Sequence, residues 1–265
     1  MKPDHIIYYS DPLSDDFAQT AIHTRDVEAG FPYVRKSRPW NYFAALLYYL
    51  VAVPVVYLIS KVYLGLKFEN RDASFQIKGT GFFLYGNHTR YLDAFLPALA
   101  AFPNRAYVVS NPDAVSLPFL KNLVLMLGVI PLPTKFTGMR SFLSTISQRY
   151  QENACVAIFP EAHIWPFYTG IRPFPDTAFR YPVKENAPVI AMVTTYRKRR
   201  GLFRFLKKPG MTVTLSQPMY PRQDLAPKQA QQELRDRVHH FMVEVSSSRE
   251  NVAYIRYEPI LNEEI

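Results

Sequence analysis

The chain has 265 residues, 48% of them hydrophobic, which excludes disorder over its whole length and suffices for one α/β domain or two small ones. Its formal net charge is +9, and seven basic residues with no acidic one lie between Arg197 and Lys208, so the basicity is a local patch. The single cysteine, Cys155, excludes an internal disulfide, and without a Cys/His array or a Gly-rich phosphate loop we expect neither a metal nor a cofactor.

The N-terminal part of the chain divides into two segments. Residues 1–39 are polar and mixed in charge, which predicts an irregular arm. Residues 40–68 contain the uncharged stretch Phe43 to Ser60, which lacks the polar face of a soluble helix. This segment is therefore expected to be membrane-associated, and a buried core helix is the alternative.

Two forms of the membrane segment remain open. Pro54 divides it into halves of about 18 Å each at 1.5 Å per residue, so a helical hairpin competes with a single helix. Basic residues flank both ends, so both ends can face the cytoplasm, and we expect the following domain on that side of the membrane.

Residues 69–265 are expected to form the catalytic domain. Short apolar runs alternate there with helical patterns, which predicts an α/β fold with a mainly parallel central sheet flanked by helices. The predicted strands are Phe82–Tyr85, Ala106–Val109, Val129–Leu132, Cys155–Phe159, Val189–Thr194 and Met211–Leu215. The predicted helices are Tyr91–Ala101, Leu117–Leu127, Gly138–Gln151 and Ala226–Val245.

A histidine and an aspartate follow the first of these strands. His88 and Asp93 are five residues apart, and on a continuous helix their side chains would diverge. They meet only if His88 lies in the loop and Asp93 in the first helical turn, where Asp93 can orient the imidazole as a base for an alcohol. The alternative is a helix-capping Asp93 beside a solvated His88.

Three more blocks lie at strand ends: Gly128 to Thr134, Phe159-Pro160-Glu161-Ala162, and Pro188-Val189-Ile190. In this order, the blocks resemble the glycerolipid acyltransferase family of the 1-acylglycerol-3-phosphate acyltransferase type. Its H-x4-D motif is matched by His88 and Asp93, and its F-P-E-G motif is matched with Ala162 in place of glycine. The resemblance covers roughly residues 75–215.

This resemblance implies that a fatty acyl group moves from an acyl thioester, on coenzyme A or acyl carrier protein, to a hydroxyl of a lysophospholipid or related lipid. It makes His88 the general base, Asp93 its orienting partner, and Glu161 a ligand of the acceptor hydroxyls. A salt-bridge or helix-start carboxylate is the alternative for Glu161. No covalent intermediate is expected, because GxSxG is absent and Cys155 lies in a predicted buried strand.

The sequence departs from the family where the phosphate of the acceptor is thought to bind. Thr134 and the pair Ala162-His163 stand where arginines are usual. The basic residues that can replace them, each of which can also be a surface charge, are Arg90, Lys135, Arg140 and Arg172. The missing arginines leave open a second hypothesis, a catalytically silent lipid-binding protein that retains the fold.

The basic segment Arg197 to Lys208 has three interpretations: a contact with anionic lipid head groups, a site for the phosphates of the acyl donor, and a solvated loop. Its interleaved apolar residues favour the membrane surface. Expected partners are therefore membrane lipids, the lipid acceptor, and acyl-CoA or acyl carrier protein. Nucleic acid is not expected, because the patch is short and no recognition motif accompanies it.

Overall fold

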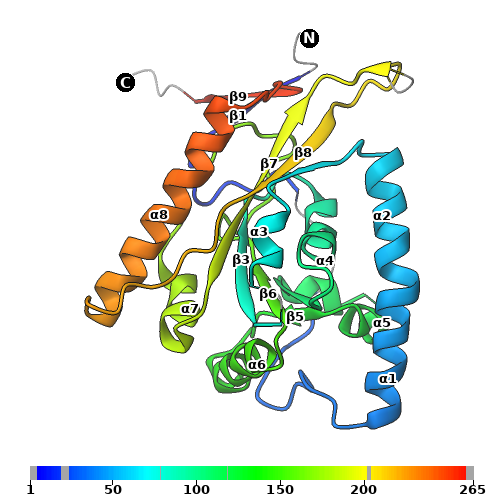
Figure 1. Ribbon diagram of the computed structural model, residues 1–265, viewed down its shortest axis with the longest axis vertical. Coiled ribbons are helices and arrows are strands. Elements are labelled where there is room, and N and C mark those ends of the chain that lie inside the picture. The colour runs from blue at the N-terminus through cyan, green and yellow to red at the C-terminus, as the bar shows by residue number, and fades with distance from the viewer. Residues whose placement is uncertain (1–4, 19–23, 78, 118, 202–203, 261–265) are drawn as a thin grey trace.

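The computed structural model describes residues 5–18, 24–77, 79–117, 119–201 and 204–260. Its centre is a seven-stranded sheet in the order β2-β8-β7-β3-β6-β4-β5, in which only the pair β7 and β8 is antiparallel (Figure 1). The strands are β2 (Lys67–Glu69), β3 (Phe82–Gly86), β4 (Ala106–Ser110), β5 (Val129–Pro131), β6 (Cys155–Ile158), β7 (Val189–Arg197) and β8 (Gly210–Leu215). The predicted α/β fold with a mainly parallel sheet is confirmed.

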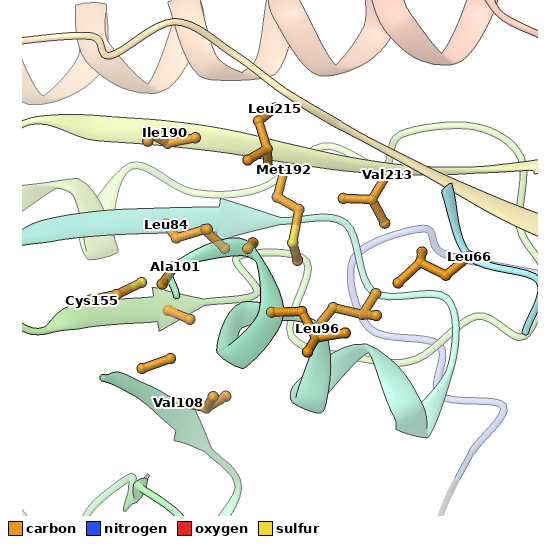
Figure 2. Close-up of a cluster of buried hydrophobic side chains, with 14 of the residues drawn as sticks. Leu66, Leu84, Leu96, Ala101, Val108, Cys155, Ile190, Met192, Val213 and Leu215 are labelled. Carbon is orange, nitrogen blue, oxygen red and sulfur yellow. The ribbon is translucent and has the colours of Figure 1, made fainter. Parts of the chain in front are cut away.

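Helices cover both faces of the sheet because successive strand residues point to opposite sides. Leu84 and Ile190 belong to one apolar core, together with Leu96, whereas Phe83 and Val189 belong to the other (Figure 2 shows the first). The helices and helical turns of the domain are α3 (Asp72–Phe75), η2 (Tyr91–Phe95), α4 (Leu96–Ala100), η3 (Pro112–Val115), α5 (Lys121–Met126), η4 (Phe136–Gly138), α6 (Met139–Gln151), η5 (Thr177–Phe179), α7 (Arg180–Glu185) and α8 (Pro227–Ser248).

A single apolar helix precedes the domain. It consists of α1 (Arg38–Leu46), the π-helical turn η1 (Leu47–Ala52) and α2 (Val53–Val62), and the chain runs through Pro54 without reversing (Figure 1). The expected alternative of a helical hairpin is therefore wrong: the wider π turn immediately before Pro54 accommodates a residue that lacks an N–H group.

This helix is long and apolar enough to cross a membrane, with a mean hydropathy of 2.1 over an 18-residue window. Only 17% of that window is buried, which excludes the core-helix alternative. The helix packs lengthwise on the domain through a few residues: the Tyr48 hydroxyl accepts from the backbone N–H of Ala106, and the Tyr49 hydroxyl donates to the carbonyl of Pro103.

The described part of residues 1–39, expected to be irregular, contains a strand. Strand β1 (His5–Tyr9) pairs in parallel with β9 (Ile255–Pro259), and the two form a separate small sheet beside the end of α8 (Figure 1). Local sequence patterns do not show this pairing, because each strand is half exposed and its partner lies at the other end of the chain.

Candidate active site

The loop after β3 places His88 at the carboxyl end of the central strands. Its predecessor Asn87 is buried, and its side-chain amide both donates to the carbonyl of Thr194 and accepts from the N–H of Thr194 on β7. The imidazole of His88 stacks on the ring of Phe159, with 4.5 Å between ring centroids, and its side chain is 14% exposed. The ring is thus held in place and still accessible from solvent.

Asp93 combines the two roles that the sequence left as alternatives. Its Oδ2 accepts from the backbone N–H groups of Thr89 at 2.6 Å and Arg90 at 2.7 Å, which secures the first turn of η2. The same oxygen lies 3.6 Å from Nδ1 of His88, and Asp93 is fully buried. The gap is longer than a hydrogen bond, so Nδ1 faces the carboxylate without bonding to it directly.

Two residues that sequence reasoning missed support this pair. The phenol of Tyr196 donates to the hydroxyl of Thr89 at 2.7 Å, and Thr89 in turn contacts Asp93. Burial raises the pKa of Tyr196, and the nearby Asp93 carboxylate raises it further, so the phenol stays protonated and remains a donor. Thr89 occupies a variable position inside the H-x4-D motif, and Tyr196 falls in no motif, so only the pairing of β7 with β3 brings Tyr196 to the site.

Glu161 lies beside His88 and contacts the backbone of its loop. Its Oε2 accepts from the backbone N–H of His88 at 3.1 Å and lies 3.3 Å from Nη2 of Arg172, while its Oε1 accepts from the backbone N–H of Arg172. Burial raises the pKa of Glu161, and the Arg172 guanidinium and the two backbone donors oppose that rise. Both carboxylate oxygens are therefore engaged by groups of the protein, as in the salt-bridge alternative from sequence.

Arg172, expected as a phosphate ligand, is also occupied. Its side chain is 1% exposed, its guanidinium lies over the ring of Trp165, and it donates to the carbonyls of His163 and Pro12. The residue joins the loop after β6 to the N-terminal arm. Arg172 and Glu161 therefore form a buried pair that holds the His88 loop.

The arm continues across this edge of the sheet. The indole N–H of Trp165 donates to the carbonyl of Asp15 at 2.8 Å, and Nδ1 of His163 lies 3.4 Å from Oδ2 of Asp16. The ring of His163 therefore faces the arm.

Thr134 and Lys135 are not brought to His88. They follow β5, which lies three positions from β3 in the sheet, about 14 Å at 4.8 Å per strand. The hydroxyl of Thr134 accepts from the N–H of Val27, and Lys135 pairs with Asp26 and Glu28. Both residues hold the arm. Arg140 is exposed on α6, beyond the same loop.

Arg90 follows His88 by two residues in the same loop, and its guanidinium packs against an aromatic ring and a sulfur atom. Its guanidinium lies 4.8 Å from the ring centroid of Phe167 and 3.6 Å from the sulfur of Met211.

Cys155 lies within β6, fully buried, and burial raises the pKa of its thiol, which disfavours the nucleophilic thiolate.

Comparisons with known proteins match the part of the chain that contains His88, Asp93 and Glu161. Residues 66–195 match the family model described as Acyltransferase. Among solved structures, the chain is similar to the 1-acyl-sn-glycerophosphate (LPA) acyltransferase, PlsC, from Thermotoga maritima, at 16% identity and a TM-score of 0.53, covering 81% of this chain and 96% of that one. No curated protein matches the chain. At this identity the structural likeness concerns the fold.

Proposed function

Because the chain belongs to the glycerolipid acyltransferase family through its domain at residues 66–195, we propose that it moves a fatty acyl group from an acyl thioester to a hydroxyl of a lysophospholipid or related lipid. The observation that carries this proposal is the placement of His88, accessible at a strand end with Nδ1 facing a buried Asp93. The enzyme is an O-acyltransferase, and the acceptor and donor are the proposed part.

The reaction needs one base and no protein nucleophile. Nε2 of His88 removes the proton of the acceptor hydroxyl as its oxygen attacks the thioester carbonyl, and Asp93 stabilises the resulting imidazolium at Nδ1. When the tetrahedral intermediate collapses, the C–S bond breaks and the departing thiolate takes the proton back from His88. Glu161 takes part by holding the backbone of His88, as a positioning residue.

We assign the phosphate of the acceptor to Arg90. Arg90 is two residues from His88, and the described contacts of its guanidinium are with an aromatic ring and a sulfur atom, which leave its charge available. Arg172 and Lys135, in contrast, pair with carboxylates. A phosphate-bearing lysolipid is therefore the preferred acceptor class.

The decisive experiment is single-turnover acyl transfer by purified protein supplied with an acyl thioester and a mixed lysolipid pool, with product identified by mass spectrometry. His88→Ala should lower the rate by about 10²- to 10⁴-fold, the usual contribution of a positioned base. Cys155→Ser is the matched control, and it should retain the chemical step. Absence of transfer by the wild-type protein together with lysolipid binding would instead favour the silent lipid-binding protein.

We further propose that the apolar helix attaches the enzyme to the cytoplasmic side of a membrane. Because it packs lengthwise on the domain, a crossing orientation would draw the domain into the bilayer, so its exposed side lies along one leaflet. Leu50 and Leu58 are 68% and 62% exposed, and Phe119 beside α5 is fully exposed. Leu58→Lys and Leu50→Lys together should release protein from carbonate-washed membranes, and retention of this variant would contradict the attachment.

A further inference from the structure

A basic pocket of about 670 Å³ lies between the end of α2, strand β2 and the ends of β7 and β8. Seven basic and two acidic side chains line it, the densest positive charge among the pockets described. The volume falls within the range of about 300–1,000 Å³ that is usual for small-ligand sites. The pocket includes part of the basic segment Arg197 to Lys208, of which Leu202 and Phe203 lie outside the described residues.

The inner wall of this basic pocket is formed by two arginines held by backbone oxygens. Arg197 donates to the carbonyl of Gly65, and Arg199 donates to the carbonyls of Tyr63 and Lys208. Carbonyl groups orient a guanidinium without removing its charge. The two guanidinium groups are thus fixed at the wall of the pocket while they keep their charge.

Nearby cations add to this unbalanced charge. Burial lowers the pKa of Arg197 and Arg199. Glu250 opposes this shift at Arg197, whereas Arg200 adds to it, and at Arg199 the shift is increased by Arg197 and Arg90. Of the two acidic residues, Glu250 accepts from the backbone N–H of Lys198, so one of its oxygens is already occupied. A bound anion would relieve this repulsion.

The basic pocket is connected to the active site through β7. Thr194 on this strand bonds Asn87, the neighbour of His88, and Arg197 lies three residues further along, about 10 Å at 3.3 Å per residue. Arg90, two residues from His88 in the chain, is near enough to Arg199 for its charge to lower the pKa of that residue. A ligand with its phosphates in the pocket can therefore extend a flexible arm toward His88.

We propose that this basic pocket binds the phosphate groups of coenzyme A and thereby directs the acyl donor, an inference that rests on the proposed function. Coenzyme A carries a diphosphate and a 3′-phosphate, joined to the reactive sulfur by an extended pantetheine arm, so it matches both the charge and the distance. Acyl carrier protein offers a single phosphodiester on its arm. Anionic lipid head groups share the phosphate chemistry, so the experiment separates the two sources.

The test measures binding rather than turnover. Titration calorimetry of the detergent-solubilised full-length protein with coenzyme A should give a dissociation constant that rises about tenfold in Lys67→Glu and in Arg200→Glu, two exposed residues of the pocket lining. Lys207→Glu, a charge reversal on the same basic segment but outside the pocket lining, should bind as the wild type does. Pantetheine, which lacks the phosphates, should show no difference among the four proteins.

A second titration uses phosphatidylcholine vesicles with and without phosphatidylglycerol. Unchanged affinity for coenzyme A in both pocket variants, or a loss confined to the anionic vesicles, would overturn the proposal. This result can be distinguished from a failure of the proposed function. If acyl transfer depends on His88 but the pocket variants bind coenzyme A as the wild type does, only the pocket proposal is wrong. If the pocket variants lose coenzyme A affinity but the wild type transfers no acyl group, only the proposed enzymatic function is wrong.

Discussion

Replacing Glu161 with glutamine tests whether the buried pair positions His88. The side chains of Glu161 and Arg172 are each 1% exposed, so the substitution leaves the Arg172 cation buried without its counter-ion. Removing one partner of a buried pair costs about 3–5 kcal/mol. A glutamine also has one oxygen where the carboxylate uses two, so either the N–H of His88 or that of Arg172 would face an amide N–H.

Urea unfolding of the wild type, Glu161→Gln and Glu152→Gln gives the measurement. Glu152 pairs with Arg149 at 2.6 Å on the surface, where its side chain is 42% exposed, so its loss should cost at most about 1 kcal/mol. Arg172→Met and the double variant complete a cycle, in which the double variant should be less destabilised than the sum of the single ones. Turnover of folded Glu161→Gln should fall because the His88 loop loses its anchor.

A different result would restore the expectation from sequence. If Glu161→Gln loses less than about 1 kcal/mol of stability and raises only KM for the acceptor, then Glu161 contacts the acceptor hydroxyls and the positioning argument is refuted.

Two other residues give further predictions. Ala162 has a φ of 63°, a conformation that glycine adopts without cost, so Ala162→Gly should stabilise the protein by about 1 kcal/mol and raise Tm by roughly 2–4 °C. Differential scanning fluorimetry measures this, and a lower Tm would contradict it. Burial lowers the pKa of His239, and the nearby Arg235 lowers it further. The imidazole therefore binds a proton more readily in the unfolded state, so the stability of the folded protein falls as the pH drops below about 6.5. His239→Gln should lose less stability than the wild type between neutral and mildly acidic pH in urea titrations, and parallel losses would exclude this origin.

The central strands could be predicted because they are short, apolar and buried on both faces. The predicted Phe82–Tyr85 corresponds to β3, and the predicted Met211–Leu215 corresponds to β8, each within one residue. Strand β2 was missed because it has only three residues, two of them charged, which is too short and too polar to give a strand pattern. The predicted helix Leu117–Leu127 is shorter in the structure, where α5 spans Lys121–Met126. Leu120, which precedes α5, and Leu123, which lies within it, have exposed side chains.

The site could be predicted only as far as local motifs extend. The spacing of His88 and Asp93 indicated a loop-to-helix arrangement, and the structure has it. The roles of Arg172 and Tyr196 depend on contacts across the sheet edge. No residue spacing in the sequence predicts these contacts. The partners of Lys135 come from the arm, more than a hundred residues earlier in the chain. The sequence therefore could not show that Lys135 pairs with carboxylates instead of being available to bind a phosphate.

The pairing of β1 with β9 has a consequence for the timing of synthesis. His5 is synthesised long before its partner Ile255, and contacts of such wide sequence separation form slowly. Until then the arm has no strand to pair with, and the carbonyls of Pro12 and Asp15 are not yet held near Arg172 and Trp165. A nascent chain can therefore carry a finished central sheet while its active-site edge is still uncovered, so we expect this edge to be covered only after both strands are made.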